Sequence, residues 1–159
     1  MRFLPSACLI AMALVGGVMA SEATGQDEHY TDDRSTAEAV VSSYYNAINR
    51  AEYARAYSYF GSDDAPDYDP WEFGYSDTQA VTVTFGETSE EGAAGSTYYS
   101  VPIRLDVERT EGQHAWYVGC YRLRLAQPAI QGVPFESLHI VSADLREAGE
   151  DDPLPTGCS

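Results

Sequence analysis

The chain has 159 residues, of which 25 are acidic and nine are basic, and its formal net charge is −16 at pH 7. This acidity argues against nucleic acid and anionic lipid as partners, because both require a basic face that displaces counterions. The length fits one domain, and hydrophobic residues make up 44% of the chain, which is enough for a core.

The first twenty residues have the features of a secretory signal peptide. Arg2 gives a positive start, residues 3–17 are almost uncharged, and Val18 and Ala20 take the −3 and −1 positions of a cut after Ala20. The alternative, a lipoprotein modified at Cys8, fits less well because the apolar run continues past this cysteine. We therefore expect an exported protein, periplasmic or extracellular, with no membrane span once the signal peptide is removed.

Removal of the signal peptide leaves two cysteines, Cys120 and Cys158. A pair of cysteines in an oxidising compartment usually forms a disulfide, and this is the pairing that we predict. The alternative is two unrelated thiols, one buried in a strand and one in the tail.

Residues 21–34 are polar, acidic and without pattern, and they predict a flexible leader. Ser35 and Glu38 match a capping box, which predicts that the first helix begins at this point. Its apolar stripe is formed by Val40, Val41, Tyr44, Tyr45 and Ile48.

Two shorter helices are predicted next. The first covers about residues 52–60 and ends before Gly61, which opens an acidic loop. The second begins with Asp69 as N-cap and Pro70 as first helical residue, and it carries Trp71.

From Thr78 onward the apolar residues alternate with polar ones, which predicts strands. The acidic, Gly-rich stretch 86–96 is predicted as a long loop, and Gly112 as a tight hairpin turn. Helices followed by strands predict an α+β fold with a curved antiparallel sheet of about four strands, at residues 78–85, 99–108, 114–125 and 138–145.

A register follows for the hairpin around Gly112. Pairing Arg109 with Gln113 gives one apolar face, on which the opposed pairs are Leu105–Tyr117, Val101–Tyr121 and Tyr99–Leu123. The opposite, outer face then carries Tyr98, Arg104, Asp106, Glu108, Trp116, Cys120, Arg122 and Arg124. Tyr98 lies opposite Arg124, which predicts a cation–π contact. The acidic tail, residues 148–159, is long enough for Cys158 to reach Cys120.

The order of these elements resembles the nuclear transport factor 2-like superfamily (the SnoaL/ketosteroid isomerase-like cone fold), and specifically its exported bacterial members. The resemblance covers residues 35–147 and is carried by YYNAINRAEYARAY, WEFGYSDT, VTVTFG, GAAGSTYYSVPI, YVGCYRLR and LHIVSADL. It implies a cone of curved antiparallel sheet with three helices across its concave side, and often a dimer. Because this superfamily contains isomerases, cyclases, hydrolases, transport adaptors and members without known activity, the resemblance implies no particular reaction.

An isomerase-type site would need a carboxylate or a tyrosine that points into an apolar cone, and none of the inward residues of the strand at 99–108 is acidic. The weak catalytic candidates are His139 and Asp144, of which only one can face inward in a regular strand. His114 is predicted to face solvent beside a turn, and His29 lies in the predicted flexible leader. Four aspartates in the loop at 63–69 could hold Ca²⁺, but they do not match an EF-hand, and we expect no metal or other cofactor.

Tyrosine is unusually frequent, with 12 in the chain. The simplest interpretation is core packing with hydroxyls at the rim. The functional alternative is a cleft for a flat apolar ligand, for which the candidate residues are Tyr45, Tyr57, Trp71, Tyr99 and Tyr117.

These observations favour an exported, non-catalytic binding module. It would hold an apolar ligand in the cone, or a partner protein on the sheet face, such as an envelope protein. Trp116 on the outer face favours an interface there, such as that of a homodimer, since the resemblance implies that dimers often form through this face. The alternative is an isomerase or cyclase that uses His139 or Asp144 with a cone tyrosine. A third interpretation, a dimeric structural or envelope-associated module, would need an apolar outer face around Trp116 and Val118.

Overall fold

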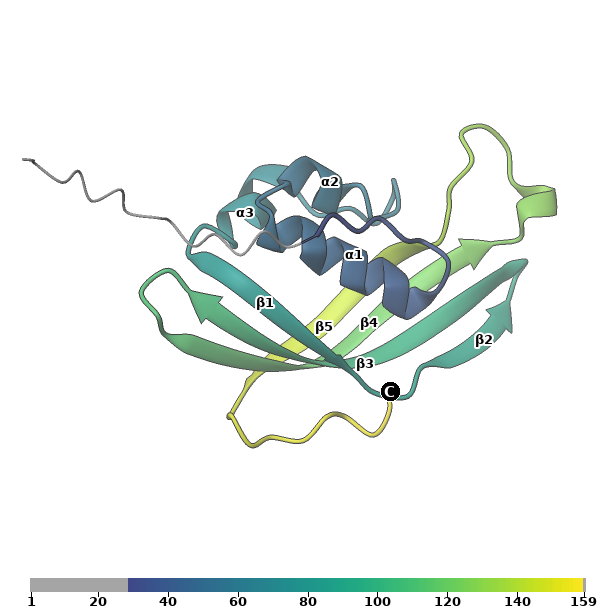
Figure 1. The fold of residues 1–159 in the computed structure, drawn as a ribbon. Coiled ribbons are helices and arrows are strands. Elements are labelled where there is room, and N and C mark those ends of the chain that lie inside the picture. The colour runs from purple at the N-terminus through teal and green to yellow at the C-terminus, as the bar shows by residue number, and fades with distance from the viewer. Residues whose placement is uncertain (1–28, 159) are drawn as a thin grey trace, which may run out of the picture.

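A computed structural model describes residues 29–158 of the chain (Figure 1). The predicted signal peptide, Cys8 and the first part of the predicted leader lie outside the described residues. The elements are α1 (Ala37–Asn49), α2 (Tyr53–Tyr57), α3 (Tyr68–Phe73), β1 (Thr78–Phe85), β2 (Ser89–Ala93), β3 (Ser96–Arg109), β4 (His114–Ala126), the 3₁₀ turn η1 (Pro128–Ile130) and β5 (His139–Ala148). None of the helices within residues 29–158 is long and apolar enough to cross a membrane.

The predicted α+β class is confirmed. The sheet is antiparallel with the order β1-β3-β4-β5, and the three helices lie over one of its faces (Figure 1). It has five strands rather than the expected four, because β2 pairs with the start of β3 within the stretch predicted as a loop. All five residues of β2 are exposed, so this strand shows no alternation of apolar and polar residues.

The register predicted for the β3–β4 hairpin is confirmed, with Arg109 joined to Gln113 and the pairs Leu105–Tyr117, Val101–Tyr121 and Tyr99–Leu123. Tyr98 does lie opposite Arg124, but the predicted cation–π partner is wrong. The guanidinium of Arg122 lies over the Tyr98 ring, 4.7 Å from its centroid, while Arg124 donates to the hydroxyl of Ser96. The Tyr98 ring therefore contacts Arg122, its diagonal neighbour on β4, instead of the directly opposed Arg124.

The cap of α1 lies one residue later than predicted. Thr36, not Ser35, is the N-cap, and its hydroxyl accepts a hydrogen bond from the Ala39 amide at 3.1 Å. Glu38 therefore does not complete a capping box but lies in the first turn of α1. There its negative charge interacts favourably with the positive end of the helix dipole.

The two short helices also differ from the prediction. α2 ends at Tyr57, because Phe60 forms a bridge to Ile140 and draws the chain toward β5. α3 follows Asp67 rather than Asp69, so that Pro70 is its third residue and not its first.

Residues 29–34, the described part of the predicted flexible leader, are held against α1. The Thr31 amide donates to the Asn46 side chain at 3.0 Å, and the Asp33 amide donates to the Ser43 hydroxyl at 2.8 Å. Polar side chains of α1 thus bind the backbone of a segment that the sequence pattern alone predicts to be flexible.

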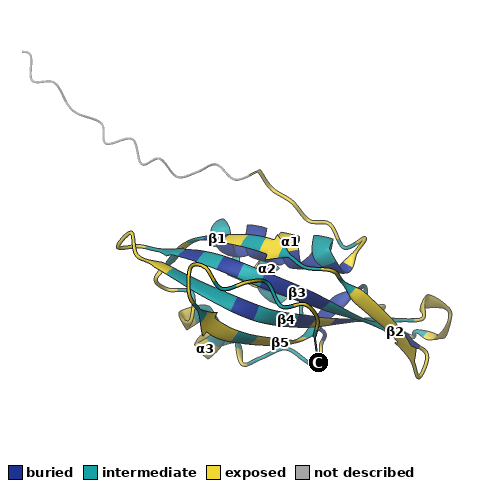
Figure 2. Cartoon of the chain, turned by 90° about the horizontal axis from the view of Figure 1, so that it is seen from below, coloured by how far each residue is buried: buried dark blue, intermediate teal, exposed yellow. Residues whose placement is uncertain are grey.

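The tail after β5 crosses the outer face of the sheet (Figure 2). The predicted disulfide between Cys120 and Cys158 is present, with Cα atoms 5.8 Å apart. Arg104 donates to backbone carbonyls of the tail, including that of Gly149 at 3.3 Å. Val118, on this face, is 1% exposed. Part of the surface expected to form a dimer is therefore covered by the chain's own tail.

Candidate functional site

A cavity of about 390 Å³ opens between α3 and the inner face of the sheet, and we call it the Trp71 cavity. It is lined by Tyr45, Pro70, Trp71, Gly74, Tyr75, Thr78, Val81, Leu105, Val107, Arg109, Tyr117 and Leu145. Three predicted ligand residues, Tyr45, Trp71 and Tyr117, come together here from α1, α3 and β4. Their meeting follows from the confirmed register, which turns the Leu105–Tyr117 pair toward the helices.

Trp71 is fixed by rings that pack around it. Its indole Nε1 donates to the Tyr44 hydroxyl at 3.2 Å, and its ring centroid lies 5.4 Å from that of Tyr57 and 5.5 Å from that of Tyr75. Tyr57 belongs to this ring cluster and not to the cavity wall, because its hydroxyl turns away to donate to the Pro66 carbonyl at 2.6 Å.

Two wall residues of the cavity, Tyr45 and Tyr75, each share a hydrogen bond with a second tyrosine. Tyr44 and Tyr75 share a hydrogen bond of 2.6 Å, and Tyr45 and Tyr121 share one of 2.8 Å. Burial raises the pKa of all four hydroxyls, and well above the ordinary value for Tyr44, Tyr45 and Tyr121. They therefore remain neutral at physiological pH and act as fixed dipoles.

Arg109 is the one residue of the wall that is charged at neutral pH. Its guanidinium forms an ion pair with Asp77 and donates to the Tyr117 hydroxyl at 3.0 Å. The hydrogen bond to Asp77 raises the pKa of Arg109 further. The charge is thus balanced at the cavity rim, and the guanidinium–Tyr117 contact gives the cavity one polar end.

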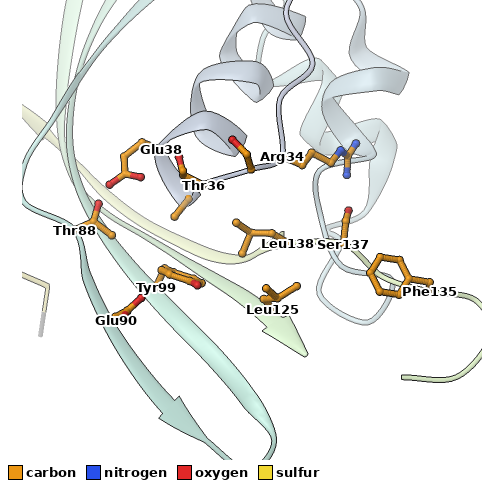
Figure 3. Close-up of a pocket in the computed structure, with 12 residues that line it drawn as sticks. Arg34, Thr36, Glu38, Thr88, Glu90, Tyr99, Leu125, Phe135, Ser137 and Leu138 are labelled. Carbon is orange, nitrogen blue, oxygen red and sulfur yellow. The ribbon is translucent and has the colours of Figure 1, made fainter. Parts of the chain in front are cut away.

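A second cavity, of about 540 Å³, holds the fourth predicted ligand residue, Tyr99 (Figure 3). We call it the Tyr99 cavity, and its wall is formed by Arg34, Ser35, Thr36, Ala37, Glu38, Thr88, Glu90, Tyr99, Leu125, Phe135, Ser137 and Leu138. Tyr99 and Leu105 share one face of β3, but they are six residues apart, which is about 20 Å along a strand. The predicted site is therefore divided between two cavities.

The two catalytic candidates line neither cavity. His139 is buried beside Gly61, with Nδ1 2.8 Å from the Ser137 carbonyl and Nε2 4.0 Å from a carboxylate oxygen of Asp64. Asp144 is exposed on β5. The hydrogen bonds of the two tyrosine hydroxyl pairs are formed among tyrosines, and the contacts of His139 are to Ser137 and Asp64.

No cluster of three or more metal-ligating side chains occurs within residues 29–158. The acidic loop between α2 and α3 contributes Asp64 to the surroundings of His139 instead.

Sequence reasoning missed Arg109 and Glu90. Arg109 lies two residues after Val107 and four after Leu105, so it is on the same face of β3. The period of two that predicts the apolar face therefore also predicts that Arg109 points toward the helices. Glu90 lies opposite Tyr99 on β2, and without that strand nothing in the sequence places it at a cavity.

Comparisons with protein-family models, curated proteins and solved structures give no match to this chain. The functional argument therefore starts from the two cavities and from the side chains that line them.

Proposed function

We propose that the chain is an exported member of the nuclear transport factor 2-like superfamily that binds a small apolar ligand in the Trp71 cavity without transforming it. Three helices over one face of an antiparallel sheet support this family, since the resemblance in sequence implies the same plan. The Cys120–Cys158 disulfide supports export, because such bonds persist in oxidising compartments.

The observation that carries the proposal is the chemistry of the cavity wall. Val81, Leu105, Val107 and Leu145 form an apolar floor, and Trp71 offers a flat aromatic surface. The volume of about 390 Å³ falls within the range of small-molecule sites. Burial raises the pKa of Tyr45 and Tyr75 and Arg109 is already paired, whereas general acid–base catalysis uses a group with a pKa near the working pH.

The polar end of the cavity orients the ligand. Tyr117 accepts a hydrogen bond from Arg109, which leaves its own O–H free to donate. An apolar ligand with one oxygen would therefore place this oxygen at Tyr117 and its flat body against Trp71. We favour the cavity over the outer sheet face as the binding site, because the tail already crosses that face.

The test is a titration with naphthalene, followed by the indole N–H signals of the two tryptophans in ¹⁵N-labelled protein. Trp71 lines the cavity, whereas Trp116 lies on the outer face and serves as an internal control. We expect a saturable shift of the Trp71 signal alone. Leu145→Trp fills this cavity and should weaken binding at least about tenfold, which corresponds to ~1.4 kcal/mol.

The matched control is Leu125→Trp, which adds the same ring to the Tyr99 cavity. It should leave naphthalene binding unchanged. Absence of saturable binding, or loss of binding in Leu125→Trp with retention in Leu145→Trp, would contradict the proposal.

A further inference from the structure

The Tyr99 cavity differs in chemistry from the Trp71 cavity and lies at the other end of β3. Its upper wall is the first turn of α1, and its lower wall is formed by β3 and the chain around β2 (Figure 3). Leu125, Leu138 and the Tyr99 ring give it an apolar floor. Phe135, which is 60% exposed, stands at its mouth. The cavity can therefore hold an apolar body of moderate size.

Two carboxylates from different elements line this cavity. Glu38 comes from α1, and Glu90 comes from β2, where it lies directly opposite Tyr99. The neighbouring Thr88 hydroxyl lowers the pKa of Glu38, so that this side chain is ionised at neutral pH. Within residues 29–158 neither carboxylate forms an ion pair.

The one cation of the wall, Arg34, is already engaged. Its guanidinium donates to the carbonyl and the hydroxyl of Ser58 at 3.1 and 2.9 Å. It also lies over the Tyr59 ring, 4.2 Å from the centroid, and 3.6 Å from a carboxylate oxygen of Asp32. Arg34 is therefore held away from Glu38 and Glu90, and the end of the cavity near these two residues is negative.

We propose that the Tyr99 cavity is a second binding site, which takes an organic cation with an ammonium group and an apolar body. The ammonium group binds between the carboxylates of Glu38 and Glu90, where the face of Tyr99 adds a cation–π contact. The apolar body lies on Leu125 and Leu138. This site is independent of the one proposed for the Trp71 cavity.

Two other classes of ligand fit less well. Anions are repelled by the two carboxylates and by the net charge of −16. Ca²⁺ takes six to eight oxygen ligands, and the apolar floor of the cavity supplies none. An organic cation uses both parts of the wall, because its charge meets the carboxylates and its hydrocarbon part meets the floor.

The test compares two probes of similar size, phenethylammonium and 2-phenylethanol, by calorimetry at low salt and by amide signals in ¹⁵N-labelled protein. We expect phenethylammonium to shift the signals of Thr88, Glu90 and Tyr99 saturably while the Trp71 indole signal stays in place. The alcohol should bind at least about tenfold more weakly, because it lacks the charge.

Charge-neutralising variants identify the site. Glu38→Gln with Glu90→Gln should weaken phenethylammonium binding about tenfold. Glu87→Gln is the matched control, since Glu87 is exposed in the same segment and does not line the cavity. Glu38 also stabilises α1 through the helix dipole, so the double variant can be less stable than the natural chain. If it unfolds, Glu90→Gln alone is the test, and it should also reduce the affinity.

Three results would overturn the proposal. Equal affinities for the alcohol and the ammonium would show that charge is not recognised. Equal effects of Glu87→Gln and Glu90→Gln would show general attraction to an acidic surface. Shifts confined to Trp71 would place the cation in the other cavity, and the naphthalene titration would still report separately on that cavity.

Discussion

Replacing both cysteines of the Cys120–Cys158 disulfide should destabilise the protein strongly. The disulfide joins positions 38 residues apart, and in the chain-entropy treatment closing a loop of this length removes about 13 cal/mol/K from the unfolded state. At 25 °C this corresponds to about 3.9 kcal/mol of folding stability.

The loss should lie below this value, at about 2–3 kcal/mol. The reason is that the tail has weak contacts of its own. Arg104 holds it through backbone carbonyls at an exposed surface, and such hydrogen bonds contribute only about 0.5–1.5 kcal/mol each. Without the disulfide the tail can detach in the folded state, which regains entropy and offsets part of the loss.

The measurement is urea unfolding of Cys120→Ser with Cys158→Ser, in a background with Cys8→Ser that leaves no other thiol. A chain that ends at residue 148 and carries Cys120→Ser is the control for the contacts of the tail. A loss below about 1 kcal/mol in the double variant, with Arg104 still bound to the tail, would refute the entropic reasoning.

Three further predictions concern the interior and the acid limit of stability. Tyr121→Phe should cost about 1–3 kcal/mol by urea unfolding, since it leaves the buried Tyr45 hydroxyl without its partner. The Tyr45→Phe, Tyr121→Phe pair should cost less than the sum of the single changes, and additive costs would contradict a shared bond. Gly119→Ala should destabilise by about 3 kcal/mol or more, because its Cβ would lie 1.9 Å from a backbone oxygen of β5, and a thermal midpoint like that of the natural chain would be the opposing result. The hydrogen bond from Tyr59 lowers the pKa of Asp32 in the folded protein below the ordinary value of 3.8. The ionised Asp32 therefore stabilises the folded protein fully above pH 3.8, and this contribution is lost as the pH falls through the lower pKa of the folded state. Unfolding measured from pH 6 to pH 3 should therefore show a shallower acid loss in Asp32→Asn, and an unchanged slope would contradict it.

The sheet was predictable where a local signal sets it. Gly112 has a positive φ of 73°, and the Arg109 amide donates to the Gln113 carbonyl across the turn at 2.8 Å. Once the turn is placed, every pair along β3 and β4 follows, because side chains alternate with a period of two. The caps of α1 and α3 were displaced by one or two residues because several neighbouring residues can cap, and tertiary contacts select among them. β2 escaped prediction since all of its residues are exposed and show no alternation of apolar and polar side chains.

The candidate site was predictable in composition but not in assembly. Alternation correctly turned Tyr99 and Tyr117 toward the helices, yet they line different cavities. Tyr57 shows the converse case, because its helical position indicates the interior while its hydroxyl is fixed by the Pro66 carbonyl outside either cavity. A periodic pattern specifies a face, whereas a cavity depends on how far apart residues lie along that face and on what covers them.

The lengths of two elements explain why the Trp71 cavity and the Tyr99 cavity lie apart on the sheet. β3 has 14 residues and spans about 46 Å, whereas α1 has 13 residues and is only about 20 Å long. α1 therefore covers part of the inner face of β3 and leaves both ends of the strand to be closed by other segments. At one end α3 supplies Trp71 and closes an apolar space, and at the other the chain before β5 supplies Phe135 and Leu138 next to the two carboxylates. Because the covering segments differ, the two ends of one sheet face have different chemistry, which is the basis of the proposals for a neutral ligand at one end and a cation at the other.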